Sequence, residues 1–416
     1  MVATQSIRRG VSRTVLDSIQ LTTNIFEAWS DEEWTVDGAD VRVCIVCFGS
    51  NDGNRMLNGV SVSVINSDLS SSSANLTSAK RLSDNLGIGF QGPVKVGAFE
   101  VSGDVARTWL KAPRNPHGRP NSDVLVPWAN GTDIVRSPRG KWIIDFGERA
   151  EAEASLFELP FEYLREIVKP FRSTNRDRQR RENWWRLGRS GADLKSATSR
   201  LNRFMVTPRV AKHRLFAWVT APMLPDTRLV AIARNDDTTF GIIHSRFHEA
   251  WSLRLGGWHG VGNDPQYTPS LGFETFPFPE GLTPNIPAEG YEHDPRAQEI
   301  AKAAKRLHEL RNVWLNPPEL VKMEPEVVPG YPDRIVPKDS QAAVTLKTRT
   351  LTNLYNQRPQ WLADAHRDLD ATVAAAYGWP TDISEEEALA KLLELNLARA
   401  GATLEPGLLE EPDDED

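Results

Sequence analysis

The sequence predicts a mixed fold, in which an α/β segment is followed by an α+β region and a helical C-terminal region. A length of 416 residues suits two or three domains. Helix-like and strand-like apolar runs alternate in the first 50 residues, whereas residues 51–160 carry mainly short strand patterns and turn signals. Beyond residue 286, three segments have the apolar spacing of helices.

The first 50 residues predict one helix and three strands. VATQSI has the pattern of the end of a buried strand, and SRTVLDSIQL has an apolar helical face. NIFEAWSDEEW and VRVCIVCFG predict two strands joined at the turn dipeptide Asp37-Gly38. Because a parallel strand needs neighbours on both sides, we expect Met1 to lie in a sheet whose earlier strands precede this chain.

The two cysteines do not predict a metal or redox site. Cys44 and Cys47 lie in VRVCIVCF, which has the composition of a buried strand. Residues three apart on a strand point to opposite faces, and no second cysteine pair is available to complete a zinc site. FGSNDG, which follows this strand, lacks the glycine spacing of a phosphate-cradling loop.

The middle of the chain alternates between strands and basic helices. KWIIDFG, FAWV and RLVAIA predict strands, and residues 161–204 predict helical, basic structure. HSRFHEAWSLRL predicts one helix with Phe247, Trp251 and Leu255 on a single stripe. If that helix is continuous, His244 and His248 lie on one side, as half of a metal site would, although no third ligand is apparent.

Residues 262–281, GNDPQYTPSLGFETFPFPEG, match neither a helix nor a strand. Four prolines stiffen this stretch and favour an extended backbone. The rings of Tyr267, Phe273, Phe276 and Phe278 project from it. The stretch is either a loop fixed by packed aromatic side chains or a clamp beside a ligand surface.

Residues 295–314, 352–377 and 384–399 predict C-terminal helices. Ser384 precedes Glu387 by three residues, which is the spacing of a capping box. NPPE at 316–319 follows the first of these patterns. It predicts the stop of a helix rather than a base-modifying motif, because Glu319 stands where an aromatic ring would stack on the target base.

Charge is divided unevenly along the chain. The net charge is −7, and residues 405–416 contain seven acids and no base, so the rest is neutral. Residues 165–260 hold nineteen Lys or Arg against eight Asp or Glu. A basic centre with an acidic end predicts a surface for polyanions, and we expect the end to be a disordered tail.

Arginine forks, lysines, histidines and aromatic rings in the basic centre are the candidate nucleic-acid contacts. A solvated helix surface is the simpler interpretation of RSTNRDRQRRENWWRLGR, and a single-stranded RNA site that uses its two tryptophans is another. The basic excess continues in TPRVAKHR, which favours DNA. The predicted contacts are Arg172, Arg176, Arg178, Arg180, Arg181, Trp184, Trp185, Arg186, Arg209, Lys212, His213, Arg214, His244, Arg246 and His248.

Several segments together resemble the second half of the MmeI-like DNA methyltransferases, the Type IIL restriction–modification enzymes. In order along the chain they are IFEAWSDEEWTVDGADVRVCIVCF, GRPNSDVLVPWANGTDI, RGKWIIDFG, PFEYLREIVKP, TPRVAKHRLF, FGIIHSRFHEAWSLRLG and GNDPQYTPSLGFETFPFP. RTLTNLYNQRPQWL and LDATVAAAYGW resemble the family's C-terminal helical region. The resemblance covers nearly the whole chain.

The resemblance implies a division into four parts. Residues 1–58 would hold the last strands of a Rossmann-like methyltransferase sheet, and residues 59–285 a DNA target recognition domain. Residues 286–400 would form the helical region, and residues 401–416 the acidic tail. The family methylates the N6 atom of adenine with S-adenosylmethionine. Its cofactor motif and its Asn-Pro-Pro-aromatic motif lie before the first matching segment, so no catalytic residue is expected in this chain.

Two functional hypotheses follow. The chain is the recognition portion of an adenine-specific methyltransferase of a restriction–modification or phage-defence system, or it is a DNA-binding subunit whose catalytic half is a separate polypeptide. In both, double-stranded DNA is the partner, and this chain alone binds no cofactor or metal and is inactive. The sequence has no apolar run of about 20 residues and no signal-peptide pattern, so we expect a cytoplasmic protein without a membrane partner.

Overall fold

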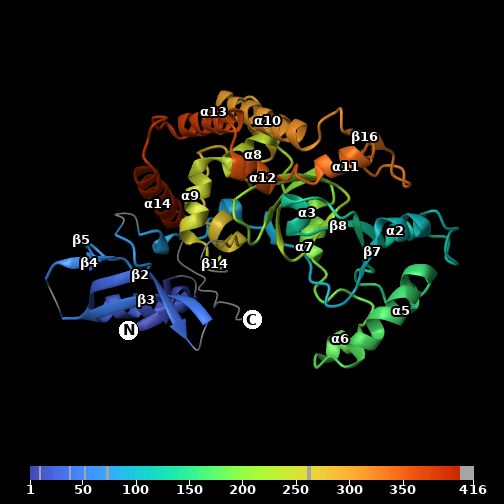
Figure 1. The fold of residues 1–416 in the computed structure, drawn as a ribbon, viewed down its shortest axis with the longest axis horizontal. Helices are drawn as coiled ribbons and strands as arrows, with labels where there is room; N and C mark the ends of the chain where they lie inside the picture. Colours follow the sequence, from blue (N-terminus) through green and yellow to red (C-terminus); the bar gives the residue numbers. More distant parts are fainter. Residues whose placement is uncertain (9–10, 37–38, 51–52, 72–74, 260–263, 403–416) are drawn as a thin grey trace.

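An N-terminal five-stranded sheet forms one end of the molecule (Figure 1). The computed structural model describes residues 1–8, 11–36, 39–50, 53–71, 75–259 and 264–402. The predicted strand pair is confirmed: β2 (Asn24–Val36) and β3 (Ala39–Gly49) run antiparallel, and the Asp37-Gly38 turn expected between them lies outside the described residues. The predicted helix is α1 (Thr14–Thr22), which buries Leu16 against the sheet.

The edges of this sheet differ from the expectation. The strand order is β1-β3-β2-β4-β5, and only the β2–β4 pair is parallel. β1 (Val2–Thr4) is an antiparallel edge strand rather than a buried one, and Val2 is 50% exposed. β4 (Arg55–Leu57) pairs with β5 (Val60–Val62), so the boundary expected at residue 58 falls inside a hairpin.

The strand assignment of the two cysteines is confirmed. Cys44 is fully buried beside Val46 in the core of this sheet, whereas Cys47 is half-buried. Neither cysteine forms a disulfide bond, and the Cys44 thiol donates to the Ser30 carbonyl at 3.2 Å. In the described part of the chain, no three His, Cys, Asp or Glu side chains are arranged to hold a metal ion.

Two four-stranded sheets form the centre of the molecule. The first is antiparallel in the order β11-β10-β13-β6, and the second has the order β12-β8-β9-β7 with one parallel pair, β12 with β8. The strands are β6 (Gly89–Gln91), β7 (Glu100–Ser102), β8 (Leu125–Ala129), β9 (Lys141–Ile144), β10 (Arg203–Pro208), β11 (Ala217–Thr220), β12 (Leu224–Pro225) and β13 (Leu229–Ile232). The strand predictions for KWIIDFG, FAWV and RLVAIA are therefore confirmed.

The second sheet carries a lobe of helices, at the right of Figure 1. Its core contains Trp142, Phe146, Phe161 and both Trp184 and Trp185. The basic segment folds into helices, as its pattern predicts, but in short pieces. The helices between residues 103 and 198 are α2 (Gly103–Leu110), α3 (Gly131–Val135), α4 (Glu151–Ala154), α5 (Glu158–Ser173), α6 (Arg178–Glu182) and α7 (Ala192–Thr198).

The C-terminal helices share one core with the first central sheet. α8 (Asp237–His244) lies against α10 (Pro295–Leu315), where a Cβ on Gly241 would stand 2.6 Å from the Ile300 side chain. Only glycine permits this close approach. The same core continues through α12 (Leu351–Gln357), α13 (Gln360–Tyr377) and α14 (Glu385–Ala402), so no core boundary lies at residue 285.

α10 ends before Asn316-Pro317-Pro318, so the prediction that NPPE stops a helix is confirmed. The hairpin β16 (Val321–Glu324) and β17 (Arg334–Pro337) and helix α11 (Ser340–Leu346) follow. The third predicted helix is α14 (Glu385–Ala402), where the Glu387 amide donates to Ser384 Oγ at 3.2 Å.

The predicted helix over 352–377 is two helices. α12 (Leu351–Gln357) ends at Arg358, which has a left-handed φ of 41°, and α13 (Gln360–Tyr377) begins after Pro359. Proline disfavours helical geometry in the residue before it and lacks an amide hydrogen, so the break has a local cause.

The aromatic stretch between α9 and α10 is packed. Tyr267, Phe273, Phe276 and Phe278 are each at most 1% exposed and belong to the core that joins the first central sheet to the C-terminal helices. The packed-loop interpretation is confirmed for these rings. No described helix has the length and apolar character needed to cross a bilayer.

Candidate nucleic-acid interface

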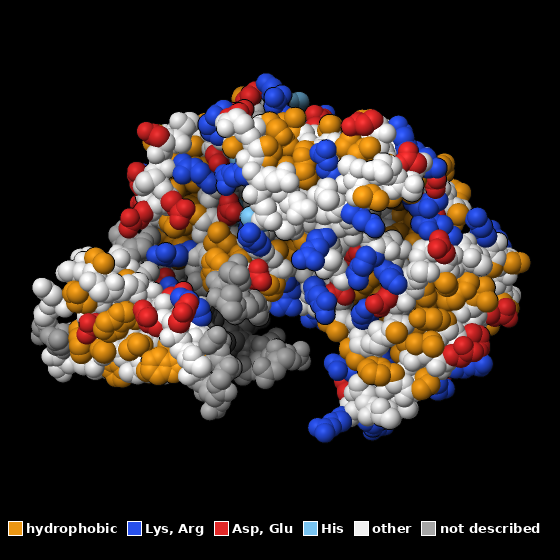
Figure 2. Space-filling view, in the orientation of Figure 1, with side chains coloured by type: hydrophobic (Ala, Val, Ile, Leu, Met, Phe, Trp, Pro, Cys, Tyr) orange, Lys and Arg blue, Asp and Glu red, His pale blue; other side chains and the backbone are white. Residues whose placement is uncertain are grey.

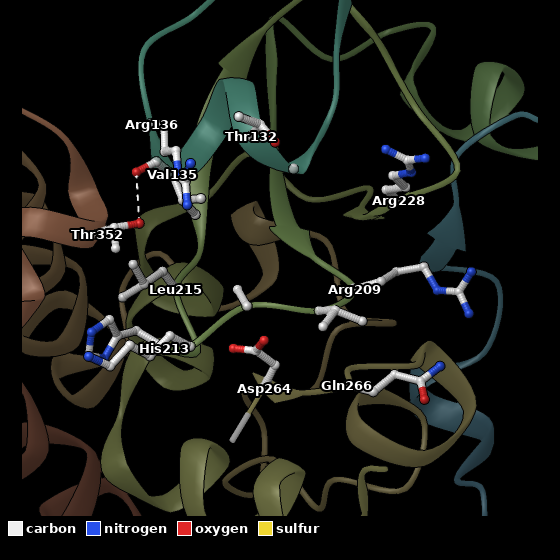
Figure 3. A pocket seen from close by; sticks show the side chains of 14 residues that line it. Thr132, Val135, Arg136, Arg209, His213, Leu215, Arg228, Asp264, Gln266 and Thr352 are labelled. Atoms are coloured by element: carbon white, nitrogen blue, oxygen red, sulfur yellow. Dashed lines mark hydrogen bonds between the residues drawn. The ribbon is translucent and has the colours of Figure 1, made fainter. Parts of the chain in front are cut away.

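A cavity of about 630 Å³ opens between the first central sheet, α3 and α12. Figure 3 shows Arg136, Arg209, Arg228 and His213 arranged around it, with Asp264 among them. Its walls come from segments far apart in sequence. They are Gly131, Thr132, Val135 and Arg136 from α3 and its end, residues 209–213 and Leu215 after β10, Arg228 before β13, Asp264 and Gln266, and Thr352 from α12.

The wall formed by residues 209–213 is held by backbone pairing on both sides. The Arg209 amide donates to the Arg228 carbonyl at 2.8 Å, and the Arg209 carbonyl accepts from the Tyr267 amide at 2.6 Å. An isolated bridge pairs Val210 with Gln266. On the opposite wall, Thr352 Oγ1 donates to the Val135 carbonyl at 3.0 Å. These contacts fix the cavity without using its basic side-chain groups.

Arg214 is buried and holds the same wall through hydrogen bonds. It is 6% exposed, and its guanidinium donates to Thr207 Oγ1 and to the carbonyls of Pro208 and Pro265, at 2.6 to 2.9 Å. Burial lowers the pKa of Arg214 to about 10, so the group stays protonated at neutral pH. Arg214 therefore serves the fold, and the DNA contact predicted for it would have to compete with these internal bonds.

The cavity presents cations that lack acidic partners. Arg136, Arg209, Lys212 and Arg228 form no ion pair with any residue that the structure describes, and Asp264 is the acidic residue of the lining. Lys212 Nζ and His213 Nε2 both contact Asn356 Oδ1, at 2.8 and 2.9 Å. We call Arg136, Arg209, Lys212 and Arg228 the cavity cations.

The electrostatic state of Arg209 favours an anionic ligand. Burial, followed by repulsion from Arg189, lowers the pKa of Arg209. A negative group placed in the cavity would relieve that repulsion. Figure 2 shows Lys and Arg side chains gathered above the hollow that separates the N-terminal sheet from the lobe of α5 and α6. The positive charge thus faces a concave part of the surface.

The segment at 172–186 contributes less to a basic face than the sequence predicts. Arg172 is 1% exposed and donates to four backbone carbonyls. Trp184 and Trp185 are 4% and 6% exposed, and their indole nitrogens donate to Glu151 and to the Arg149 carbonyl. These three residues form the lobe core, so a stacking site for single-stranded RNA on the two tryptophans is not available.

The other arginines of this segment divide into paired and unpaired groups. Arg178 pairs with Glu182 and Arg180 with Asp177, while Arg186 is held by Glu148 and by backbone carbonyls. The expected common faces of one long helix do not form, because α6 contains only residues 178–182. Of the predicted contacts in this segment, those classed as exposed are Arg176, Arg178 and Arg181.

The histidine pair is not on one helix. α8 ends at His244, Ser245 is extended, and α9 (Arg246–Leu255) begins after it. Both imidazoles are buried: His244 Nε2 contacts the Phe216 amide and Arg311, and His248 Nε2 contacts the Tyr267 hydroxyl at 3.1 Å. Both rings are thus used in the core, and the DNA contacts predicted for His244 and His248 would require them to become exposed.

Arg246 also serves the fold. Its guanidinium donates to the Ile383 carbonyl at 2.8 Å, and its amide donates to Asp370 Oδ1 at 2.8 Å. It thereby links α9 to α13 and to the segment before α14. The DNA contact predicted for Arg246 would have to compete with these bonds.

Buried histidines make the fold sensitive to acid. Burial lowers the pKa of His248 and of His366 to about 3 and that of His308 to about 4, and the pKa of His244 lies well below its ordinary value. An unfolded histidine has a pKa of about 6.5. Between about pH 6.5 and pH 4 the unfolded chain therefore binds more protons than the native chain, and stability falls as the pH falls.

Asp370 acts in the opposite direction, because burial raises its pKa to about 6 and its contribution to stability is lost as the pH rises from about 4 to about 6. Burial raises the pKa of Glu249 as well, but four histidines outweigh these two carboxyls, so we expect urea midpoints to drop from about pH 6.5 to about pH 4.5. His308→Gln should make this dependence shallower. A midpoint that stays constant over the range would contradict the assignment.

Sequence reasoning missed Arg136 and Arg228 as members of the site. Arg136 lies outside the basic segment, in the loop after α3, and Arg228 stands alone between two strands. Each reaches the cavity only because the sheet and α3 bring their segments together. Arg209, Lys212 and His213, by contrast, were predicted and do line the cavity.

Comparison with known proteins finds a similar fold in a solved structure. No family model matches the sequence, and no curated protein matches it. Among solved structures, the Type IIL restriction–modification enzyme MmeI, determined in complex with DNA, matches with a TM-score of 0.69 and 16% sequence identity. The match covers 96% of this chain and 49% of the MmeI chain, so this chain spans about half the length of that enzyme. The chain therefore has the fold of the matching part of MmeI.

Proposed function

We propose that this chain binds double-stranded DNA at the cavity lined by the cavity cations. One observation carries the proposal: four cations from three separate segments meet at one cavity and have no carboxylate partner within the described residues. Unpaired arginine and lysine groups are suited to phosphate oxygens, which release counterions on binding. The fold shared with an enzyme that was solved bound to DNA supports the same ligand.

More specifically, we propose that the chain is the sequence-recognition part of an adenine-N6 methyltransferase of a restriction–modification or phage-defence system. The cavity cations would position the duplex through its phosphates, and neighbouring side chains would read base edges. The exposed arginines Arg176, Arg178 and Arg181 are candidates for a second set of phosphate contacts.

S-adenosylmethionine does not suit the cavity, since its sulfonium group is a cation and would meet the unpaired charges of Arg136, Arg209 and Arg228. We place the cofactor and the methyl transfer on a separate or upstream catalytic polypeptide. The N-terminal sheet offers apolar side chains to such a partner: Val2, Trp34, Phe48 and Val60 are between 41% and 63% exposed.

Salt-dependent binding tests the proposal directly. We expect the purified chain to prefer a duplex over a single strand, with an affinity that falls steeply as salt rises, because each phosphate contact contributes about −0.9 to the logarithmic slope. With radiolabelled S-adenosylmethionine, the chain alone should transfer no methyl group to DNA. Addition of a catalytic polypeptide carrying the Asn-Pro-Pro-aromatic motif should restore transfer. Equal affinity for single strands would contradict the proposed preference for duplex DNA. Methylation by the chain alone would contradict the placement of methyl transfer on another polypeptide.

A further inference from the structure

The cavity also fits an acidic peptide, and this chain carries one. Residues 403–416 contain seven acids, Glu405, Glu410, Glu411, Asp413, Asp414, Glu415 and Asp416, and no base. The cavity cations are accessible and lack acidic partners among the described residues. We propose that residues 403–416 dock into this cavity in the same molecule and compete there with duplex DNA. The DNA part of this inference rests on the proposed function, whereas the docking does not.

The position of α14 makes the contact feasible. Near its end, Asn396 Nδ2 donates to the carbonyls of Lys80 and Thr275 at 2.7 Å, and Arg399 Nη1 donates to the Phe278 carbonyl at 2.7 Å. These bonds fix the point from which residues 403–416 start. α14 packs beside α9, as Figure 1 shows.

The length of α9, against which α14 packs, gives a scale for the distance to be covered. α9 has ten residues, which corresponds to about 15 Å of helix. The chain after it leads through β14 (Trp258–His259) to β15 (Asp264–Pro265), and Asp264 lines the cavity. Fourteen extended residues reach up to about 48 Å, roughly three times the length of α9. Residues 403–416 can therefore reach the cavity from the end of α14.

Charge and tethering both favour this occupant. Seven carboxylates complement four cations, and Asp264 is the acidic group of the lining that opposes them. A segment tethered to the same molecule acts at an effective concentration of about a millimolar or more, so weak pairing is sufficient to keep the cavity occupied. Duplex DNA displaces the segment because it offers more phosphate contacts than the cavity alone accepts.

The first experiment replaces all seven acids by their amides in the full chain. The variant should bind duplex DNA about tenfold more tightly in low salt, and the difference should shrink as added salt screens the intramolecular pairing. An unchanged affinity for DNA would overturn the proposed competition.

The second experiment does not involve DNA. A carbodiimide joins a carboxylate to an amine in contact with it, and Lys212 is the lysine of the cavity lining. We expect peptide mapping of the treated full chain to recover amide links between Lys212 and residues 405–416, and we expect Lys212→Arg to abolish them while keeping the charge. Links spread evenly over Lys302, Lys322 and Lys347, or links between two copies, would overturn docking within one molecule.

The two experiments separate the possible failures. Amide links at Lys212 in a chain that binds no duplex would support the docking and refute the proposed function. Duplex binding that depends on the cavity cations, without coupling at Lys212, would sustain the proposed function and refute the docking.

Discussion

Replacing the four cavity cations by glutamine, in Arg136→Gln/Arg209→Gln/Lys212→Gln/Arg228→Gln, should weaken duplex binding about a hundredfold or more at about 0.1 M salt. Each lost phosphate contact lowers the salt slope by about 0.9, so the slope should become shallower by up to about 3.6. Fluorescence anisotropy across a salt series measures both quantities. The four side chains form no ion pair within the described chain, so their loss should leave the urea midpoint nearly unchanged.

A matched control distinguishes the effect of losing the cavity cations from the effect of losing four positive charges elsewhere. Lys302, Lys305 and Arg306 lie exposed on α10, and Lys347 is exposed after α11. Their replacement by glutamine removes the same four charges away from the cavity lining. If binding depended only on total charge, both variants would lose affinity equally. Equal losses would therefore refute the cavity as the interface, whereas a control that binds like the unmodified chain would support it.

The elements that were predicted correctly have strong local signals. β2 and β3 combine dense apolar and β-branched residues with a turn dipeptide, and α10 combines helical spacing with the Pro317-Pro318 stop. The breaks at Ser245 and Arg358 were not predicted. Pro359 was a visible signal for the second break. Nothing comparable marks Ser245, where the chain turns because Phe247 and Trp251 must enter the core.

The candidate site was predicted only in part, because a count of basic residues does not say where each side chain points. Arg172 and Arg214 raise the local charge as much as Arg209 does, yet the fold buries both and uses them to hold carbonyl groups. Arg136 contributes to the cavity although it lies outside the basic segment that the sequence analysis singled out. Periodicity predicts which residues share a face of one element, but this cavity joins several elements, and only their packing defines it.

Arg172→Met should destabilise the lobe of α5 and α6 by about 3–5 kcal/mol, the range found when one partner of a buried charged network is removed. The guanidinium donates to the carbonyls of Lys95 and Val96 on one side and of Asn183 and Arg186 on the other. It also lies over the Phe99 ring, with Cζ 4.9 Å from the ring centroid. Methionine keeps most of the apolar stem but removes all four bonds, and the Lys95 and Asn183 carbonyls then keep only their backbone partners, the amides of Gly188 and Arg186.

Urea unfolding followed by tryptophan fluorescence measures this effect, because Trp184 and Trp185 lie in the affected core. Arg178→Met is the matched control: its side chain is 78% exposed and, among the described residues, pairs with Glu182 one turn away, so its loss should leave the urea midpoint nearly unchanged. If both variants unfolded at the same urea concentration as the unmodified chain, Arg172 would have no structural role. If Arg172→Met alone is destabilised, arginines on the same basic segment serve opposite purposes: Arg172 holds the lobe together, and those left exposed on its surface are available to a polyanion.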